Sequence, residues 1–357
     1  MSGNEAHPRH PSRSAGESLP LPTFAHLRKL TDGRGIWEHA LYFTYRREHG
    51  YCTDDNARAL VVVSRQAALS EDLTDLAEIY LRFVLDARTP SGQFHNRRDA
   101  EGTWIDDVGS DDCQGRAWWA LGTAARLALD PAMRDAAVDA FATCVTFESP
   151  HLRANTYAAL GAAELAASAG RSTAALEFLD RTSATIADAA RAAIPWPEAR
   201  LTYANARVPE ALIAAGSALG DRHRLAMGLR LLDWLVDTET KGDHFSFTPV
   251  GGRGRGESGP AFDQQPIEAW GMADAAHRAW SVTEDTMWRA RAVRAASWLV
   301  GLNDTGAILY DEATGGTGDG LMPAGINENR GAESTIAGIG ALQVAAALHI
   351  PAGRPNR

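Results

Sequence analysis

Apolar residues recur at helical spacing along most of this chain, in about twelve segments separated by polar stretches. The segments are 23–30, 56–69, 73–87, 116–129, 132–147, 155–169, 173–194, 209–219, 222–238, 266–280, 284–302 and 333–348. The alternation of apolar and polar residues that is typical of strands is scarce, and it predicts only a short hairpin near 244–248. The pattern therefore predicts an all-α protein.

Two kinds of helix alternate along the chain. Segments 57–63, 117–128 and 332–347 are apolar on every side, which is typical of a helix surrounded by other helices, whereas their partners carry charged faces. Helical hairpins of this kind bury their apolar faces by stacking and closing on one another. We therefore expect six inner and six outer helices, an (α/α)6 toroid formed by a single domain over 19–350. The polar segment 1–18 and the segment 351–357 are expected to be tails, and 1–18 has no apolar stretch of the signal-peptide kind.

Six polar motifs stand near the starts of apolar helices, at 53–58, 110–116, 153–157, 203–207, 262–268 and 327–334. One interpretation is structural, because Asp54, Asp111, Asn155, Asn205 and Asp263 could each cap a helix N-terminus. Each motif, however, contains more polar residues than a cap requires. Long connections over 88–109, 195–204, 241–261 and 303–326 lead into the same end of the predicted ring, and they carry aromatic residues such as Trp104, Trp196 and Tyr203. The arrangement predicts a deep polar pocket that suits a hydroxyl-rich ligand.

The acids of these motifs are candidates for glycosidic bond cleavage, which needs one carboxylic acid and one carboxylate. We expect the catalytic pair to come from Asp55, Asp112 and Asp263, with Asp54 as a helix cap and Asp55 as the reacting member of its pair. Carboxylates on different inner helices favour an inverting reaction, which needs a separation of ~6.5–9.5 Å. The expected substrate-binding residues are His49, Tyr51, Asp54, Asn56, Arg58, Asp111, Arg116, Asn205, Arg207, Gln264, Gln265, Glu268, Asn327, Asn329, Arg330 and Glu333.

Charge and composition exclude several other classes. The net charge of −10, without a basic stripe, argues against a nucleic-acid partner. The sequence contains no run of 18 apolar residues, so we expect no membrane span. Cys52, Cys113 and Cys144 are too scattered for a disulfide framework or a zinc site and are expected to be buried packing residues. We expect no cofactor and no metal, calcium on pocket carboxylates being the weaker alternative. The plain expectation is a cytoplasmic monomer or dimer.

Four motifs resemble a known family. They are HGYCTDDNARAL at 49–60, GSDD at 109–112 with Gly115-Arg116, FDQQPIEA at 262–269 and GAEST at 331–335. They resemble a group of bacterial (α/α)6-toroid proteins that occur free-standing or joined to glycosyltransferases and are often described as glycosidase-like. The resemblance covers about 27–350 and implies a sugar-handling toroid. Ala204 and Gln114 stand where the relatives tend to have Asp and His, so a role that needs an acid at 204 is lost.

A glycoside hydrolase that acts on an oligosaccharide is the leading hypothesis. The same fold also carries sugar epimerases and isomerases, whose chemistry usually relies on histidine. A phosphorylase would need phosphate at the Gly-Arg segment 251–259, although a flexible pocket-rim loop is the preferred interpretation of that segment. A polysaccharide lyase would need an acidic sugar as its substrate, and such a sugar fits poorly beside so many carboxylates. The non-enzyme alternative is a carbohydrate-binding partner of a separate glycosyltransferase.

Overall fold

The computed structural model describes residues 18–349 except 69, 144–146, 169–171 and 194, so the predicted tails and Cys144 fall almost entirely outside it. The described part contains twelve α-helices. They are α1 (Ala25–Lys29), α2 (Thr53–Ser64), α3 (Glu71–Asp86), α4 (Asp111–Leu127), α5 (Pro131–Phe141), α6 (Leu152–Ala166), α7 (Thr173–Ala192), α8 (Arg207–Leu219), α9 (Arg222–Glu239), α10 (Pro266–Thr283), α11 (Thr286–Ser297) and α12 (Ala332–His349). The prediction of an all-α protein is confirmed.

The strands are confined to the connections, where they form two-stranded antiparallel ribbons. The ribbons are β1 (Ala40–Leu41) with β2 (Thr44–Tyr45), β3 (Tyr51–Cys52) with β4 (Arg97–Arg98), β5 (Arg200–Leu201) with β8 (Arg253–Gly254), β6 (Thr240–Lys241) with β7 (His244–Phe245), and β9 (Gly320–Met322) with β10 (Gly325–Asn327). The hairpin expected near 244–248 is therefore present as β6 and β7, in the register Thr240 opposite Phe245.

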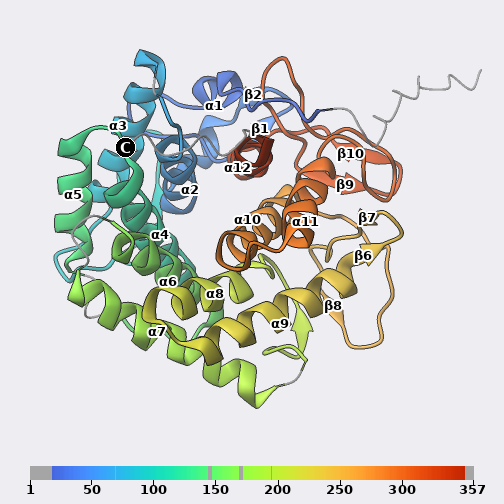
Figure 1. The fold of residues 1–357 in the computed structure, drawn as a ribbon. Helices are drawn as coiled ribbons and strands as arrows, with labels where there is room; N and C mark the ends of the chain where they lie inside the picture. Colours follow the sequence, from blue (N-terminus) through green and yellow to red (C-terminus); the bar gives the residue numbers. More distant parts are fainter. Residues whose placement is uncertain (1–17, 69, 144–146, 169–171, 194, 350–357) are drawn as a thin grey trace, which may run out of the picture.

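Six helices form a closed inner ring (Figure 1). In the order α2, α4, α6, α8, α10 and α12, each helix packs against the next, and α12 packs against α2. The helices α3, α5, α7, α9 and α11 pack outside this ring, and the five-residue α1 packs against α12. This is the predicted (α/α)6 toroid. No helix among the described residues combines the length and the apolar character needed to cross a membrane.

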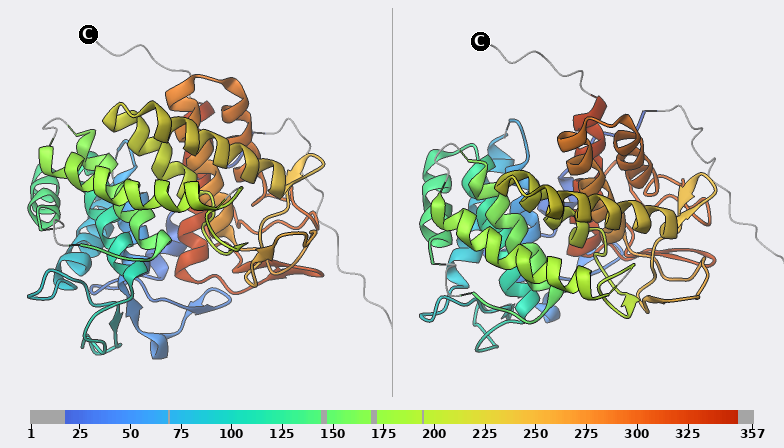
Figure 2. Two further views of the ribbon diagram at one scale, coloured as in Figure 1. Left: turned by 90° about the horizontal axis from the view of Figure 1, so that it is seen from below. Right: turned by 60° about the horizontal axis from the view of Figure 1, so that its bottom comes forward.

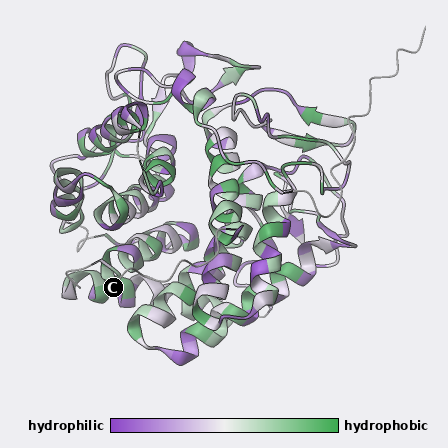
Figure 3. Cartoon of the chain, turned by 45° about the horizontal axis from the view of Figure 1, so that its top comes forward, coloured by the Kyte–Doolittle hydropathy of each residue, from purple (hydrophilic) through white to green (hydrophobic). Residues whose placement is uncertain are grey.

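Composition explains which helices lie inside. Most residues of α2, α4 and α12 are buried, because these helices have neighbours on all sides. Small residues let the inner helices approach closely: a Cβ on Gly122 of α4 would lie 2.0 Å from the carbonyl oxygen of Gly161 in α6. In Figure 3 the outer helices carry alternating hydrophilic and hydrophobic bands, as expected for helices with one face toward solvent.

Buried charges fill the middle of the ring. Arg207, at the start of α8, is almost completely buried with its guanidinium between the rings of Trp119 and Trp270, 4.7 Å from each centroid. It donates to Asp274 of α10 at 2.6 Å, and Asp274 also pairs with Arg65, just after α2, at 2.9 Å. Side chains from opposite sides of the ring thus meet at its axis. The interior is therefore packed, and only its ends remain open for a ligand.

The connections that precede the inner helices gather at one end of the molecule, since all six inner helices run in the same direction. Figure 2 shows the loops and hairpins of the N-terminal third together at this end. It is the end at which the predicted motifs stand, and we call it the loop end.

Candidate active site

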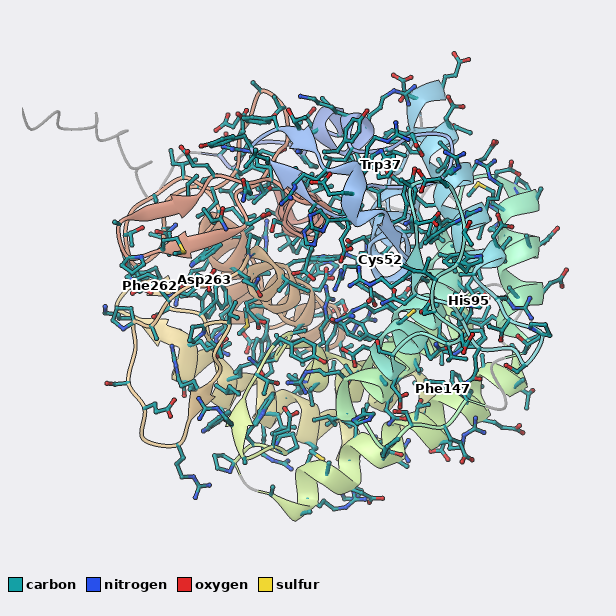
Figure 4. All side chains as sticks on the ribbon, turned by 180° about the vertical axis from the view of Figure 1, so that it is seen from behind. Trp37, Cys52, His95, Phe147, Phe262 and Asp263 are labelled. Carbon is teal, nitrogen blue, oxygen red and sulfur yellow. The ribbon has the colours of Figure 1, made fainter. Side chains whose placement is uncertain are left out.

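A polar pocket of about 470 Å³ opens at the loop end of the ring. The first turns of α2, α4 and α12 and the connections that precede α2, α10 and α12 contribute its walls. Its lining residues are Glu38, His39, Cys52, Asp54, Asp55, Arg58, Arg116, Asp263, Gln265, Asp319, Asn327, Gly331, Glu333 and Ser334. In Figure 4, Cys52 and Asp263 lie on different sides of the centre of the ring. The pocket thus brings together residues from both halves of the chain.

Capping by the motif acids was a wrong prediction. The helix α2 begins at Thr53, and Cys52 at its N-cap makes no side-chain capping bond, so Asp54 and Asp55 both lie inside the first turn. In α4 the cap is Ser110, whose Oγ accepts the N–H of Cys113, and not Asp111. The helices α6, α8 and α10 have no side-chain cap at all. None of these five helices is capped by an acid of its motif. The motif acids are therefore free to make other contacts.

Asp54 is held as a carboxylate. Its oxygens accept bonds from Arg116 Nη1 at 2.8 Å and from Asn96 Nδ2 at 3.1 Å. Burial by itself would raise the pKa of Asp54, but the positive charges of Arg116 and Arg58 outweigh burial and keep this pKa below its ordinary value. Asp54 is therefore ionised and has hydrogen-bond partners on both oxygens at neutral pH.

Asp55 has the opposite character. Burial raises its pKa to about 7, the nearby carboxylates of Glu333 and Glu38 add to the rise, and the Arg58 guanidinium and a hydrogen bond from Cys52 oppose it. Arg58 Nη1 donates to Asp55 at 2.6 Å, and its Nη2 pairs with Glu333 at 2.7 Å. Asp55 can therefore hold or release a proton near neutral pH, which is what a general acid requires.

Cys52 lies beside Asp55 and keeps its proton. Its Sγ donates to Asp55 Oδ2 at 3.2 Å, and burial together with the charge of Asp55 holds the pKa of the thiol well above its usual range. A neutral buried thiol is a poor nucleophile. Glu38, Cys52 and Asp55 place their donor atoms within 4.8 Å of one another, and among the described residues they are the group whose geometry could hold a cation.

The opposite wall of the pocket carries further acids. Asp263 comes from the connection before α10, and Asp319 from the connection before β9. The Asp319 carboxylate accepts the N–H of Gly331 at 2.8 Å, and burial raises its pKa above the ordinary value. His39 stands near Glu38, with 3.7 Å between its Nε2 and a Glu38 oxygen.

Six of these lining residues lie outside the set of predicted site residues, namely Glu38, His39, Cys52, Asp319, Gly331 and Ser334. Asp319 belongs to the long connection 303–326, whose length already marks it as a pocket wall. Glu38 and His39 precede the first motif and carry no signal in the sequence. Only the ribbons at the loop end bring them to the pocket.

The second Asp-Asp motif divides between two places. Asp112 lies next to the pocket without lining it: the Tyr203 hydroxyl donates to it, and Arg116 Nη2 is 3.3 Å away. The Asp111 carboxylate instead accepts a bond from Ser149 Oγ and lies 4.0 Å from His151, on the outer side of this wall. Arg116 therefore joins Asp112 to Asp54, while Asp111 has no part in the pocket.

Several predicted substrate-binding residues serve the fold in this structure. Tyr51 is fully buried, with its hydroxyl on Asp32 at 2.7 Å and its ring stacked on Trp37. Asn56 Nδ2 donates to the Cys52 carbonyl at 2.8 Å. Gln264 is likewise buried and accepts the Phe247 N–H at 3.1 Å. These three residues lie outside the lining of the pocket.

The remaining predicted residues lie around the pocket or below it. Glu268 accepts the N–H groups of Ala204 and Asn205, and burial with the nearby Glu239 raises its pKa to about 8. Arg207 occupies the centre of the ring as described. The last three lie at the rim: His49 contacts the His39 ring edge-on, Asn329 accepts the Tyr42 N–H, and Arg330 stacks over Phe43. Of the predicted set, Asp54, Asp55, Arg58, Arg116, Asp263, Gln265, Asn327 and Glu333 line the pocket.

The Gly-Arg segment 251–259 lies elsewhere. Its Arg253 and Gly254 form β8, pair with β5 and line a separate cavity with Trp196. None of its residues is among those that line the polar pocket. A phosphate on this segment would therefore not lie among the pocket acids, which removes the structural basis of the phosphorylase alternative.

No family model and no curated protein matches this chain. Its fold is similar to solved structures over nearly its whole length. A sugar epimerase from a ruminal bacterium is 14% identical with a TM-score of 0.68, over 91% of this chain and 95% of that chain. The cellobiose 2-epimerase of Bacillus thermoamylovorans B4167 is 12% identical with a TM-score of 0.70, over 92% and 96%. The GH76 alpha-mannanase BT2949 of Bacteroides thetaiotaomicron is 12% identical with a TM-score of 0.62, over 89% and 91%. Identities this low establish the shared (α/α)6 fold and leave the reaction to the site.

Proposed function

We propose that this protein is a glycoside hydrolase in which Asp55 is the general acid and Asp263 the general base. The observation that carries the proposal is that both acids line one pocket, while burial gives Asp55 a pKa of about 7. The fold is one on which both sugar epimerases and a mannanase occur, so a carbohydrate substrate agrees with it.

In this mechanism the Asp55 carboxyl gives its proton to the glycosidic oxygen as the bond to the anomeric carbon breaks. Asp263, on another wall of the pocket, takes a proton from the water that attacks the same carbon from the opposite face, which inverts its configuration. Arg58 and Arg116 remain as donors for sugar hydroxyls, with Asp54 as a permanently ionised acceptor.

The charges of the pocket also select the substrate. Besides Asp55, which carries the catalytic proton, five acidic side chains line it against two guanidinium groups. An acidic sugar would be repelled by this excess of negative charge. We therefore expect a neutral oligosaccharide.

Wild-type protein should be incubated with a panel of mannan-, glucan- and xylan-derived oligosaccharides, and the products and reducing ends measured. We expect new reducing ends and a loss of about 10²- to 10⁴-fold in kcat/KM for Asp55→Asn and for Asp263→Asn. Asp111→Asn is the matched control, because this carboxylate binds Ser149 outside the pocket and its loss should leave turnover intact. Full activity of Asp55→Asn or Asp263→Asn would refute the assignment, and tight binding without turnover would favour a carbohydrate-binding protein.

A sugar epimerase or isomerase is the second candidate, and His39 in the pocket wall favours it. Among the described residues, it is the one histidine that lines the polar pocket. Histidine is the usual acid and base for this chemistry. The same panel separates the two reactions. Interconversion of mannose, glucose or their disaccharides without new reducing ends, lost in His39→Gln, would replace the hydrolase.

A further inference from the structure

A second cavity, of about 750 Å³, is separate from the polar pocket, with which it has no lining residue in common. It is formed by the connection between α7 and α8, by the last two turns of α9 and by the β5–β8 ribbon. We call it the tryptophan cavity after Trp196 and Trp234, which line it. Its size is in the range of cavities that hold small-molecule ligands.

The two indole rings form its apolar surface. They are stacked, with centroids 5.7 Å apart and planes 25° from parallel. Trp196 is buried, and Trp234 on α9 is only half-buried, so the pair gives the cavity an aromatic wall. Flat aromatic surfaces of this kind pack against the C–H faces of sugar rings.

Fixed polar groups complete the cavity. Arg253 donates to the carbonyl oxygens of Thr238 and Ser246, both at 3.1 Å, and Arg200 pairs with Glu257 at 3.2 Å. The charges of these two arginines are therefore already engaged within the protein. The combination of an aromatic wall with arginines that are already paired suits a neutral hydroxyl-rich ligand better than a phosphate.

A series of ion pairs and hydrogen bonds connects this cavity to the polar pocket. Glu198, in the cavity wall, pairs with Arg153 at 2.8 Å, and Arg153 Nε donates to the Tyr203 carbonyl at 2.7 Å. The Tyr203 hydroxyl donates to Asp112, which Arg116 joins to the pocket. The two cavities have no lining residue in common, and this series of contacts through Arg153, Tyr203 and Asp112 links them.

We propose that the tryptophan cavity is an accessory sugar-binding site, which holds a distal unit of an oligosaccharide whose other end lies in the polar pocket. The proposal rests on the proposed carbohydrate function. It predicts that long glycans bind more tightly than short ones, and that this difference depends on the indole of Trp234.

The experiment measures binding without turnover, in proteins that all carry Asp55→Asn. Retardation in native gels that contain yeast mannan, hydroxyethyl cellulose or soluble starch reports long glycans, and calorimetry with mannobiose, cellobiose and maltose reports short ones. Trp234→Leu keeps an apolar side chain but removes the aromatic face. We expect it to weaken binding of the retarding polysaccharide about tenfold while leaving disaccharide binding unchanged.

Trp280→Leu is the matched control, because this tryptophan is also partly buried but lies on α10, outside the lining of the tryptophan cavity. It should retain full polysaccharide binding. Arg200→Ala, at the exposed rim, serves as a second variant if Trp234→Leu lowers the thermal midpoint, and it should weaken polysaccharide binding as well.

Three results would overturn the inference. They are unchanged retardation of both Trp234→Leu and Arg200→Ala, a loss of disaccharide binding equal to the loss of polysaccharide binding, or no retardation by any of the polysaccharides. These results differ from a failure of the proposed function. If wild-type protein hydrolyses nothing but Trp234-dependent retardation persists, the hydrolase fails and the accessory site stands. If Trp234→Leu, in the protein that retains Asp55, hydrolyses glycans of every length as efficiently as the wild type does, the accessory site is refuted and the hydrolase proposal stands.

Discussion

The unusual proton affinity of Asp55 makes a sharp prediction about stability. This carboxyl is buried in the native protein with a pKa of about 7, whereas its ordinary value is 3.8. Between these values the native state holds a proton that the unfolded chain has released. The stability of the wild-type protein should therefore fall as pH rises through this window. Asp55→Asn removes the titration, keeps the shape of the side chain and should abolish the fall.

The magnitude follows from the same two values. The whole difference corresponds to about 4 kcal/mol, and about 3 kcal/mol of it lies between pH 5 and pH 8. Asp55→Asn should thus gain about 3 kcal/mol relative to the wild type over this range. The gain concerns the pH dependence alone, because Asp55→Asn also removes a carboxyl group that pairs with Arg58 at every pH.

Denaturant unfolding of both proteins at half-unit pH steps from 5 to 8 measures the effect. Asp54→Asn is the matched control, because it is the same substitution at the neighbouring residue. The pKa of Asp54 lies below its ordinary value, so its contribution is fully present in this range and is lost only in acid. This variant should lose stability by a similar amount at every pH, on the order of 3 kcal/mol, since Arg116 keeps Asp112 but loses the nearer of its two carboxylates. Parallel curves for the wild type and Asp55→Asn would refute the reasoning.

Three further predictions concern the packing and the thiol. Gly122→Ala should lower the thermal midpoint markedly, because the new methyl group would overlap the backbone of Gly161. Arg207→Met should cost about 3–5 kcal/mol in denaturant unfolding because it leaves buried carboxylates short of a cation, whereas Arg191→Met, in an exposed ion pair with Asp188, should cost less than about 1 kcal/mol. Cys52 should react with a thiol reagent at pH 8 only after unfolding, as mass spectrometry can show, since burial holds its pKa high.

Part of the pocket was accessible from the sequence. Adjacent acids before an apolar helix predict polar side chains at one end of the ring, and Asp54, Asp55, Asp263 and Glu333 do line the pocket. The prediction of a cap at Asp54 failed, because α2 begins at Thr53 and lets the carboxylate reach Arg116 on the next inner helix. A loss of stability on removing Asp54 is still expected, but its cause is this ion pair.

The local sequence by itself determined the helices and the ring. A period of 3.6 residues and the difference between fully apolar and half-charged helices are properties of short segments, so they can be read without knowing the fold. The direction of each polar side chain is not such a property. Arg58 forms ion pairs with Asp55 and Glu333, which are 3 and 275 positions away in the sequence. Glu38 and Asp319 lie in irregular loops that line the pocket. Only the closed ring brings these groups together. Both carboxyls are buried, and the different charges around each of them separate the pKa of Asp55 from that of Asp54.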